Sequence, residues 1–196
     1  MDIARVEYDG GGDWYTGPQA LPELVRFANE ATALSINPDA TSVRLTDDDL
    51  YRYPILYLTG HGRVEFSDEE ARRLRHYLEN GGFLHIDDDY GLDEYIRPEM
   101  EKVFPDQEFV ELPFDHEIYH AHFSFPDGLP KIHEHDGEPP QGFGLFDEDG
   151  RLVVFYTYET DLGNGWDPPE VHGHSEEIRE PALQMGTNIL VYALTR

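Results

Sequence analysis

The sequence contains no cysteine and almost no lysine. Without cysteine the chain can form no disulfide, no thiolate metal site and no covalent intermediate on a thiol. Lys102 and Lys131 are the only lysines, so the positive charge is mostly arginine. No apolar run approaches the length of a membrane span, and the N-terminus lacks a signal-peptide pattern. We expect a cytoplasmic location from the sequence alone, or export if a leader was trimmed.

Positive charge is scarce overall, and the formal net charge is −27. The acidic residues are spread along the chain, so their repulsion costs stability at low ionic strength and is screened by salt. This pattern predicts adaptation to salt-rich surroundings, with cation binding as the alternative. Nucleic acid is excluded as a partner because no basic patch offsets repulsion from phosphates. We expect a small polar ligand or a protein partner instead.

Residues 54–91 form the clearest structural unit. Ile55–Leu58 is a short apolar run ended by glycines, which is typical of a buried strand. Ser67 and Glu70 have the spacing of a helix capping box, and apolar residues recur at helical spacing after them. Phe83–Ile86 is a second apolar run. The unit is therefore strand–helix–strand, which predicts two parallel strands with a right-handed crossover.

The rest of the chain continues this alternation of strands and helices, so we expect one α/β domain over residues 1–196 with a mostly parallel sheet, a C-terminal β-hairpin and a final helix. An irregular, loop-rich excursion interrupts it at about 109–144. The further elements we expect are strands at Ile3–Tyr8 and Thr41–Leu45, helices over 21–28 and 92–103, a hairpin of 144–146 with 152–156, and a helix that begins at Pro181.

Polar loops follow four of the apolar runs, at 9–15, 59–62, 87–91 and 159–166. Ligands of open parallel sheets bind beyond the carboxyl ends of the strands, and we expect at least the first three loops to meet there. The candidate ligand-binding residues are Gly10, Gly11, Gly12, Asp13, Trp14, Tyr15, His61, Asp87, Asp88, His116, Asp161 and Trp166.

Each candidate also has a structural explanation. The glycines allow a ligand to approach the backbone closely, or they form a tight turn. His61 suits a general base, a metal ligand or a histidine held in a turn. We expect His85 to be a core residue, and one of Asp87, Asp88 and Asp89 to cap the next helix.

Two pairs of histidines have His-x-His spacing, which can chelate zinc on an extended segment. They are His133 with His135 and His172 with His174. The sequence shows no third ligand in register with either pair, so surface histidines are the commoner explanation. The tryptophans and tyrosines among the candidates form either aromatic walls or core.

Several motifs together resemble a bacterial family catalogued as domain of unknown function 4159. They are residues 5–15, 59–62, 81–84 with Asp87 and Asp88, 115–118 and 161–166. The resemblance implies a flavodoxin-like three-layer sandwich of the class I glutamine amidotransferase-like type, and no established reaction. True glutamine amidotransferases have a cysteine after the strand equivalent to Phe83–Ile86. Because this chain has none, glutaminase chemistry through a thioester is excluded.

Two functions follow, and neither assigns a catalytic residue. The first is a non-catalytic ligand-binding or interaction domain that lacks the nucleophile and needs no cofactor. The alternative is a metal-dependent hydrolase in which His61, Asp87 and Asp88, joined by His116, hold a divalent ion that activates water. A serine hydrolase is disfavoured because no Gly-x-Ser-x-Gly motif is present.

Overall fold

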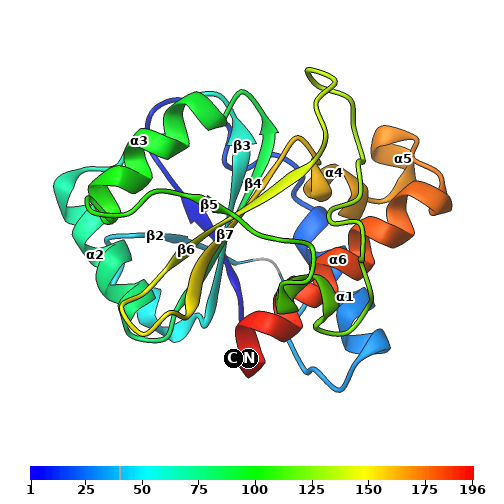
Figure 1. Cartoon of the computed structure of the whole chain (residues 1–196), viewed down its shortest axis with the longest axis horizontal. Coiled ribbons are helices and arrows are strands. Elements are labelled where there is room, and N and C mark those ends of the chain that lie inside the picture. Colours follow the sequence, from blue (N-terminus) through cyan, green and yellow to red (C-terminus); the bar gives the residue numbers. More distant parts are fainter. Residues whose placement is uncertain (40) are drawn as a thin grey trace.

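The computed structural model describes residues 1–39 and 41–196. Within these residues the centre is a seven-stranded sheet in the order β2-β1-β3-β4-β7-β6-β5 (Figure 1). Only β6 runs antiparallel to its neighbours. The first five strands follow the order of flavodoxin-like sheets, so the predicted α/β class with a mostly parallel sheet is confirmed. The strands are β1 (Ala4–Glu7), β2 (Thr41–Arg44), β3 (Ile55–His61), β4 (Phe83–Tyr90), β5 (Val110–Glu111), β6 (Gln141–Phe146) and β7 (Leu152–Tyr158).

Helices cover both faces of the sheet. Figure 1 shows α2 (Asp68–Glu79) and α3 (Asp93–Val103) on one side, and α1 (Ala20–Ala31) and α6 (Glu176–Thr195) on the other. Alternate strand residues enter the two cores, because successive side chains point to opposite faces. The short helices are η1 (Leu50–Arg52), η2 (Glu117–His120), α4 (Leu162–Trp166) and α5 (Pro169–His172). No helix of the described residues is long and apolar enough to cross a membrane.

The strand–helix–strand unit forms as predicted. Strands β3 and β4 pair in parallel, and Ser67 and Glu70 make both hydrogen bonds of the capping box. The apolar residues of α2 face the sheet and are buried. The glycines that end the helix also have a steric role, because a Cβ at Gly82 would lie 2.3 Å from the ring of Tyr77.

Three boundaries differ from the prediction. Strand β4 continues to Tyr90, because Asp87, Asp88 and Tyr90 still pair with β3, and Asp87 also pairs with β7. Helix α6 begins at Glu176 instead of Pro181, so Pro181 lies inside the helix, in its second turn. Residues 162–166 form a short helix where the sequence predicts a loop.

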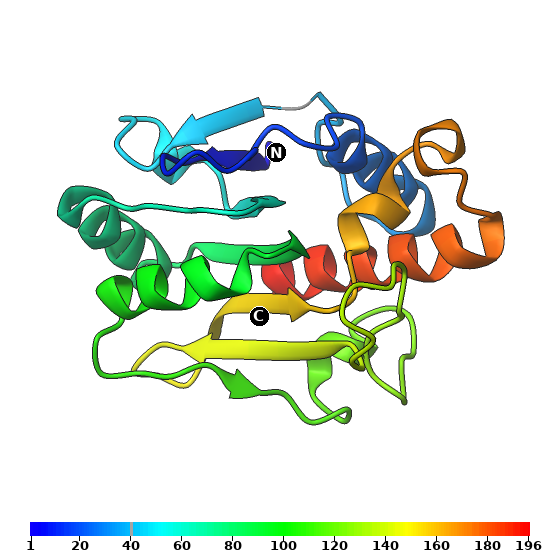
Figure 2. The same ribbon diagram turned by 90° about the horizontal axis from the view of Figure 1, so that it is seen from above.

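The hairpin of β6 and β7 is confirmed, with its turn at Asp147–Gly150, but it belongs to the central sheet because β7 also pairs with β4. The excursion before it contains only β5 and η2 as regular elements of the described chain. Its last part returns to the sheet, and Figure 2 shows it beside α4, beyond the ends of β4 and β7.

Candidate functional site

The carboxyl ends of β1, β3, β4 and β7 lie at one edge of the sheet (Figure 2). Side chains from all four polar loops meet there. Asp13 contacts His61, His61 contacts Asp89, and Asp89 lies beside Asp161. This is the edge at which open parallel sheets bind ligands.

The glycines after β1 pack against the chain that follows β3. The amide of Gly12 donates to the carbonyl of Arg63 over 2.9 Å. A Cβ at Gly10 or Gly12 would lie 2.8 Å from that carbonyl oxygen, so both positions require glycine for close backbone approach. These glycines therefore bring the loop after β1 close to the chain's own backbone and not to a ligand. The close packing places Asp13 beside His61.

Asp13 and His61 form a doubly bonded pair. The backbone amide of His61 donates to Oδ1 of Asp13 over 2.5 Å, and Nδ1 of the ring lies 3.0 Å from Oδ2. The ring therefore donates Nδ1–H to the carboxylate and carries its lone pair on Nε2. In the described residues no hydrogen bond ends on Nε2, and the side chain of His61 is 49% exposed.

Asp87 and Asp88 have structural partners. Asp87 accepts from the amides of Leu162 and Gly163, at the start of α4, and Asp88 accepts from the amide of Leu92, at the start of α3. Burial raises the pKa of Asp87 to about 7 and that of Asp88 to about 6. Asp88 thus holds the turn before α3, but the N-cap of that helix is Leu92, so none of the three aspartates takes the capping position that the sequence predicts.

Asp89 and Asp161 form a pair of buried carboxylates. Asp161 is fully buried and Asp89 is 5% exposed. Burial, together with repulsion from Asp161 and hydrogen bonding to it, raises the pKa of Asp89 well above its usual range. Oδ1 of each residue is buried without a hydrogen-bond partner among the described residues. Such atoms are costly to bury unless a cation or another donor satisfies them.

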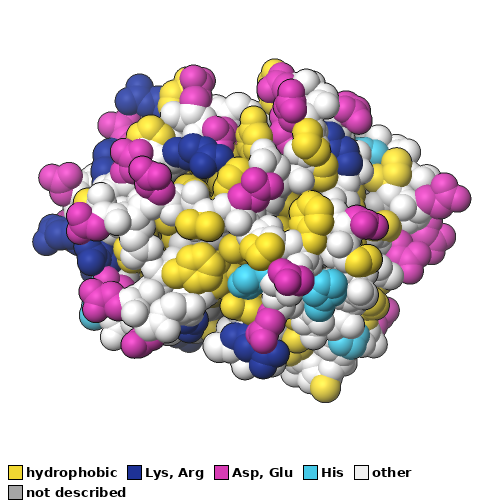
Figure 3. All heavy atoms as spheres, in the orientation of Figure 1, with side chains coloured by type: hydrophobic (Ala, Val, Ile, Leu, Met, Phe, Trp, Pro, Cys, Tyr) yellow, Lys and Arg dark blue, Asp and Glu magenta, His cyan; other side chains and the backbone are white. Residues whose placement is uncertain are grey.

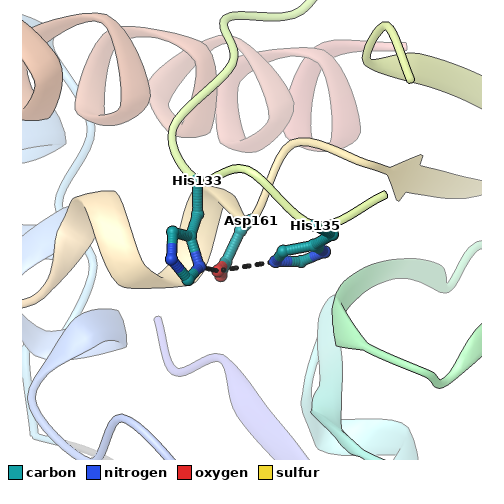
Figure 4. Close-up of side chains that lie close together, drawn as sticks. All are labelled: His133, His135 and Asp161. Carbon is teal, nitrogen blue, oxygen red and sulfur yellow. Dashed lines mark hydrogen bonds and ion pairs between the residues drawn. The ribbon is translucent and has the colours of Figure 1, made fainter. Parts of the chain in front are cut away.

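Two histidines of the excursion converge on Asp161. Nδ1 of His133 lies 3.4 Å and Nε2 of His135 lies 3.3 Å from its Oδ2 (Figure 4). The three ligand atoms lie within 4.8 Å of one another. Asn164 donates to the same oxygen over 2.5 Å, which fixes the carboxylate. This is the one group of three potential metal-ligating side chains found in the described residues.

An open pocket of about 280 Å³ lies over this group. The pocket connects the Asp13–His61 pair with the group around Asp161, because His61, His133 and His135 all line it. The lining residues are His61, Asp89, Tyr90, His133, Glu134, His135 and Asn164.

The backbone is strained around the pocket. Tyr90, Glu159 and Asp161 are the non-glycine residues of the described chain with positive φ, at 146°, 58° and 62°. Tyr90 packs edge-on against His135, with ring centroids 5.0 Å apart. Strained residues persist where surrounding contacts hold them, and they gather at functional sites.

The second His-x-His pair lies near the first. His172 and His174 stack with ring centroids 5.5 Å apart, and Nε2 of His172 lies 3.0 Å from Asp167. Burial, followed by repulsion from His172, lowers the pKa of His174. The pair does not belong to a three-ligand group in the described residues.

Several predicted site residues lie elsewhere. His116 precedes η2 and packs against Phe146 and Tyr192, away from the pocket lining. Trp166 is 1% exposed and donates to a backbone carbonyl, so it offers no surface to a ligand. Trp14 packs against the core and Tyr15 is 63% exposed, and neither lines the pocket. Gly11 has a φ of 97°, and a Cβ added there would meet no atom within 4 Å.

The candidate list from the sequence omits six residues of the site: Asp89, Tyr90, His133, Glu134, His135 and Asn164. The signal for the two histidines is their spacing, which the sequence shows, but their third partner comes from a loop 26 residues further along the chain. Nothing in the local sequence distinguishes Asp89 from its neighbours.

Comparison with curated proteins finds no match to this chain. The model of one family, described as Domain of unknown function (DUF4159), matches residues 2–194. That match spans almost the whole sequence, including every residue of the site. The chain therefore belongs to the family described as Domain of unknown function (DUF4159).

Proposed function

We propose that this protein binds a divalent transition-metal ion through His133, His135 and Asp161, and holds a small polar ligand in the adjoining pocket. The observation that carries the proposal is the convergence of two imidazole nitrogens and a buried carboxylate oxygen within 4.8 Å. Imidazole and carboxylate together suit zinc, iron and manganese. Three protein ligands leave a position open for water or for a ligand.

The surroundings of the three residues support a cation. A bound ion would neutralise the charge of Asp161 and would reduce its repulsion with Asp89. Asn164 would hold the carboxylate from the second shell of contacts, which is the usual arrangement around metal ligands. Both histidines must be neutral to bind, so metal uptake would release protons at acidic pH.

His61, Asp87 and Asp88 are a less suitable ligand set. Asp87 and Asp88 already accept hydrogen bonds from backbone amides, whereas Oδ2 of Asp161 faces two imidazole nitrogens. The carboxylates beside His61 are those of Asp13, at 3.0 Å, and Asp89, at 3.4 Å. We therefore propose the histidines of the excursion as the metal ligands, and His61 is not one of them.

The finer fold assignment is also part of this proposal. The strand order supports a single domain of the class I glutamine amidotransferase-like type that has lost its nucleophile. Asp87 follows Phe83–Ile86, where those enzymes carry their cysteine. Its carboxylate accepts a hydrogen bond from an amide at the start of α4. The pocket then uses new residues on an inherited scaffold, as folds commonly allow.

Elemental mass spectrometry of untagged protein, purified without chelators, tests the proposal first. We expect about one equivalent of zinc, iron or manganese per chain. Calorimetric titration of the stripped protein with zinc should then give one site, and His133→Gln should weaken it by at least about tenfold. His133 is 58% exposed, so this substitution should not disturb the fold.

His76→Gln is the matched control, because His76 lies on α2 and bonds only to Asn80. It should bind zinc like the parent. Asp161→Asn tests the buried ligand with little change in shape, and asparagine tolerates the left-handed backbone at this position. A parent that takes up no metal, or a His133→Gln variant that binds zinc as tightly as the parent, would overturn the proposal.

A further inference from the structure

We infer that the site is hydrolytic, and that His61, held by Asp13, is the general base that activates water for attack on a neutral carboxylic ester. The inference rests on the proposed metal site and assigns it a reaction and a substrate class. It is carried by the Asp13–His61 pair, which metal binding alone does not require.

The hydrogen bonds of His61 fix its tautomer. Asp13 accepts from both the backbone amide and the ring Nδ1 of His61, so the ring cannot rotate without breaking a bond of 3.0 Å. An imidazole whose Nδ1–H is held by a carboxylate presents Nε2 as a base, and the carboxylate stabilises the imidazolium that forms. Asp13 is therefore a positioning residue and His61 is the catalytic one.

The loops that hold this pair are built for close contact. A Cβ at Gly60, just before His61, would lie 2.2 Å from the hydroxyl of Tyr8 and 3.2 Å from the carboxylate of Asp13. The hydroxyl of Tyr8 in turn donates to the carbonyl of Thr59 over 3.1 Å. The position of His61 is thus set by contacts on several sides and not by a single hydrogen bond.

The pair and the candidate metal ligands share one space. His61 lines the same pocket as His133 and His135. Asp89 connects the two parts, since it lies 3.4 Å from Nδ1 of His61 and beside Asp161. These ligands would hold an ion and its water in the same pocket as His61, whose Nε2 makes no hydrogen bond within the described residues.

The reaction balances without any further reagent. Nε2 of His61 takes a proton from the water, and the oxygen forms a bond to the ester carbonyl carbon. The carbon–oxygen bond to the alcohol then breaks, and the imidazolium returns its proton to the leaving oxygen. One ester and one water give one carboxylic acid and one alcohol, and His61 is restored.

The charge of the pocket selects the substrate class. No lysine or arginine lines it among the described residues, whereas Asp89 and Glu134 do. Phosphate esters are usually held by such cations, and here the bound ion would be the sole source of positive charge, with no side chain among the described lining residues to add to it. Tyr90, which is 51% exposed, offers a flat apolar surface for the acyl or alcohol group. A neutral ester fits these features best.

Steady-state hydrolysis of p-nitrophenyl acetate by zinc-loaded and chelator-stripped protein tests the inference, with zinc content measured on every sample. We expect zinc-dependent turnover in the parent, and a kcat at least about 100-fold lower in His61→Gln, with zinc stoichiometry and affinity unchanged. Asp13→Asn should lower kcat with little effect on KM, because it removes orientation and not substrate contact. His76→Gln should match the parent, which separates the site from the background reactivity of surface imidazoles.

The outcomes are distinguishable. A parent that binds no zinc overturns the proposed function, and this inference with it. A parent that binds zinc but shows no zinc-dependent turnover, or a His61→Gln variant that keeps the parent's kcat, overturns the inference alone. Faster zinc-dependent turnover of the anionic diester bis(p-nitrophenyl) phosphate than of the acetate would overturn the substrate class.

Discussion

His85 is a polar side chain in the middle of an apolar sheet face. It is 2% exposed, and its ring packs between those of Tyr57, Phe155 and Trp166. Nε2 lies 3.0 Å from the hydroxyl of Thr157, which satisfies one ring nitrogen. Burial lowers the pKa of His85 to about 3. The sequence prediction of a core histidine is thereby confirmed, and the residue makes stability depend on pH.

The sign of that dependence follows from the two pKa values. Between its folded pKa of about 3 and its unfolded value of about 6.5, His85 is neutral when folded and charged when unfolded. Unfolding therefore takes up a proton in this range, and stability falls as the pH falls. We expect His85 to contribute a loss of about 2 kcal/mol in the free energy of unfolding between about pH 7 and pH 5.

Urea denaturation of the parent and of His85→Gln at several pH values measures this contribution. Glutamine keeps a hydrogen-bonding group for Thr157 but does not titrate. The difference in unfolding free energy between the two proteins should shift by about 2 kcal/mol over that range in favour of the variant at low pH. A constant difference across the range would show that His85 does not titrate in this way.

At the scale of elements, the excursion is fastened to the end of β7 just before the candidate metal ligands. Nζ of Lys131 lies 2.7 Å from Glu159, which is 1% exposed, and also donates to the carbonyl of Glu138. The amide of Ile132 donates to the carbonyl of Thr160 over 3.0 Å. These bonds set the position of the chain from which His133 and His135 reach Asp161.

The two lysines of the chain allow a matched comparison. Lys102 makes a pair with Glu99 at the same 2.7 Å, but its side chain is 42% exposed, against 21% for Lys131. Lys131→Met should cost about 3 kcal/mol of stability, because it leaves the Glu159 carboxylate buried and unpaired. Lys102→Met should cost less, because the Glu99 carboxylate keeps the hydrogen bond from the amide of Phe66 and the lost pair is more exposed. Chemical denaturation of both variants measures the difference.

A double variant tests the cause. Lys131→Met combined with Glu159→Gln removes both charges, and it should recover much of the stability that Lys131→Met loses. If the double variant is less stable than Lys131→Met alone, the cost lies in lost packing and not in an unpaired charge. Zinc affinity should fall in Lys131→Met under the proposed function, because the ligand segment loses an anchor.

Local patterns predict the local parts of this fold. The capping box of Ser67 and Glu70 and the glycines at 81–82 bound α2 correctly, since caps and breakers act within a few residues. The parallel pairing of β3 and β4 follows from the short crossover. The excursion has no such period, so its path could not be predicted from the sequence.

The candidate site is formed mostly by long-range contacts, and for that reason sequence reasoning finds only part of it. Asp13, His61 and Asp161 follow strands, so the sheet edge rule places them. The roles of Asp87 and Asp89 depend on what lies across the sheet: Asp87 caps α4, and Asp89 meets His61. Two aspartates that lie two residues apart on one strand thus acquire different contacts from the tertiary structure.

At the scale of the whole molecule, acidic side chains are numerous, and on the face drawn in Figure 3 they are spread widely among fewer lysines and arginines. The net charge of −27 is therefore not confined to the site. One dense example is the hairpin turn, where Asp147, Glu148 and Asp149 line a hollow with Glu79. Like charges at such spacing repel, and the repulsion is relieved when the chain unfolds or when salt screens it.

Salt should therefore stabilise the folded chain until screening is complete. Raising NaCl from about 0.01 M to about 1 M shortens the Debye length from about 30 Å to about 3 Å. We expect the Tm of metal-stripped protein at neutral pH to rise by at least about 5 °C, since about 1 kcal/mol moves the Tm of a chain this size by about 2–4 °C. The rise should level off near 1 M, whereas solute exclusion would continue to increase stability at higher concentrations.

Glu148→Lys provides the internal control for this experiment. Glu148 is exposed and has acidic neighbours, so its reversal should raise the Tm at low salt. The gain should disappear at about 1 M NaCl, where the charges no longer interact over that distance. A parent Tm that does not change with salt, or a Glu148→Lys gain of equal size at both concentrations, would show that dispersed repulsion is not what limits stability. The same melting curves would then assign the acidic surface to solubility and not to an adaptation to salt.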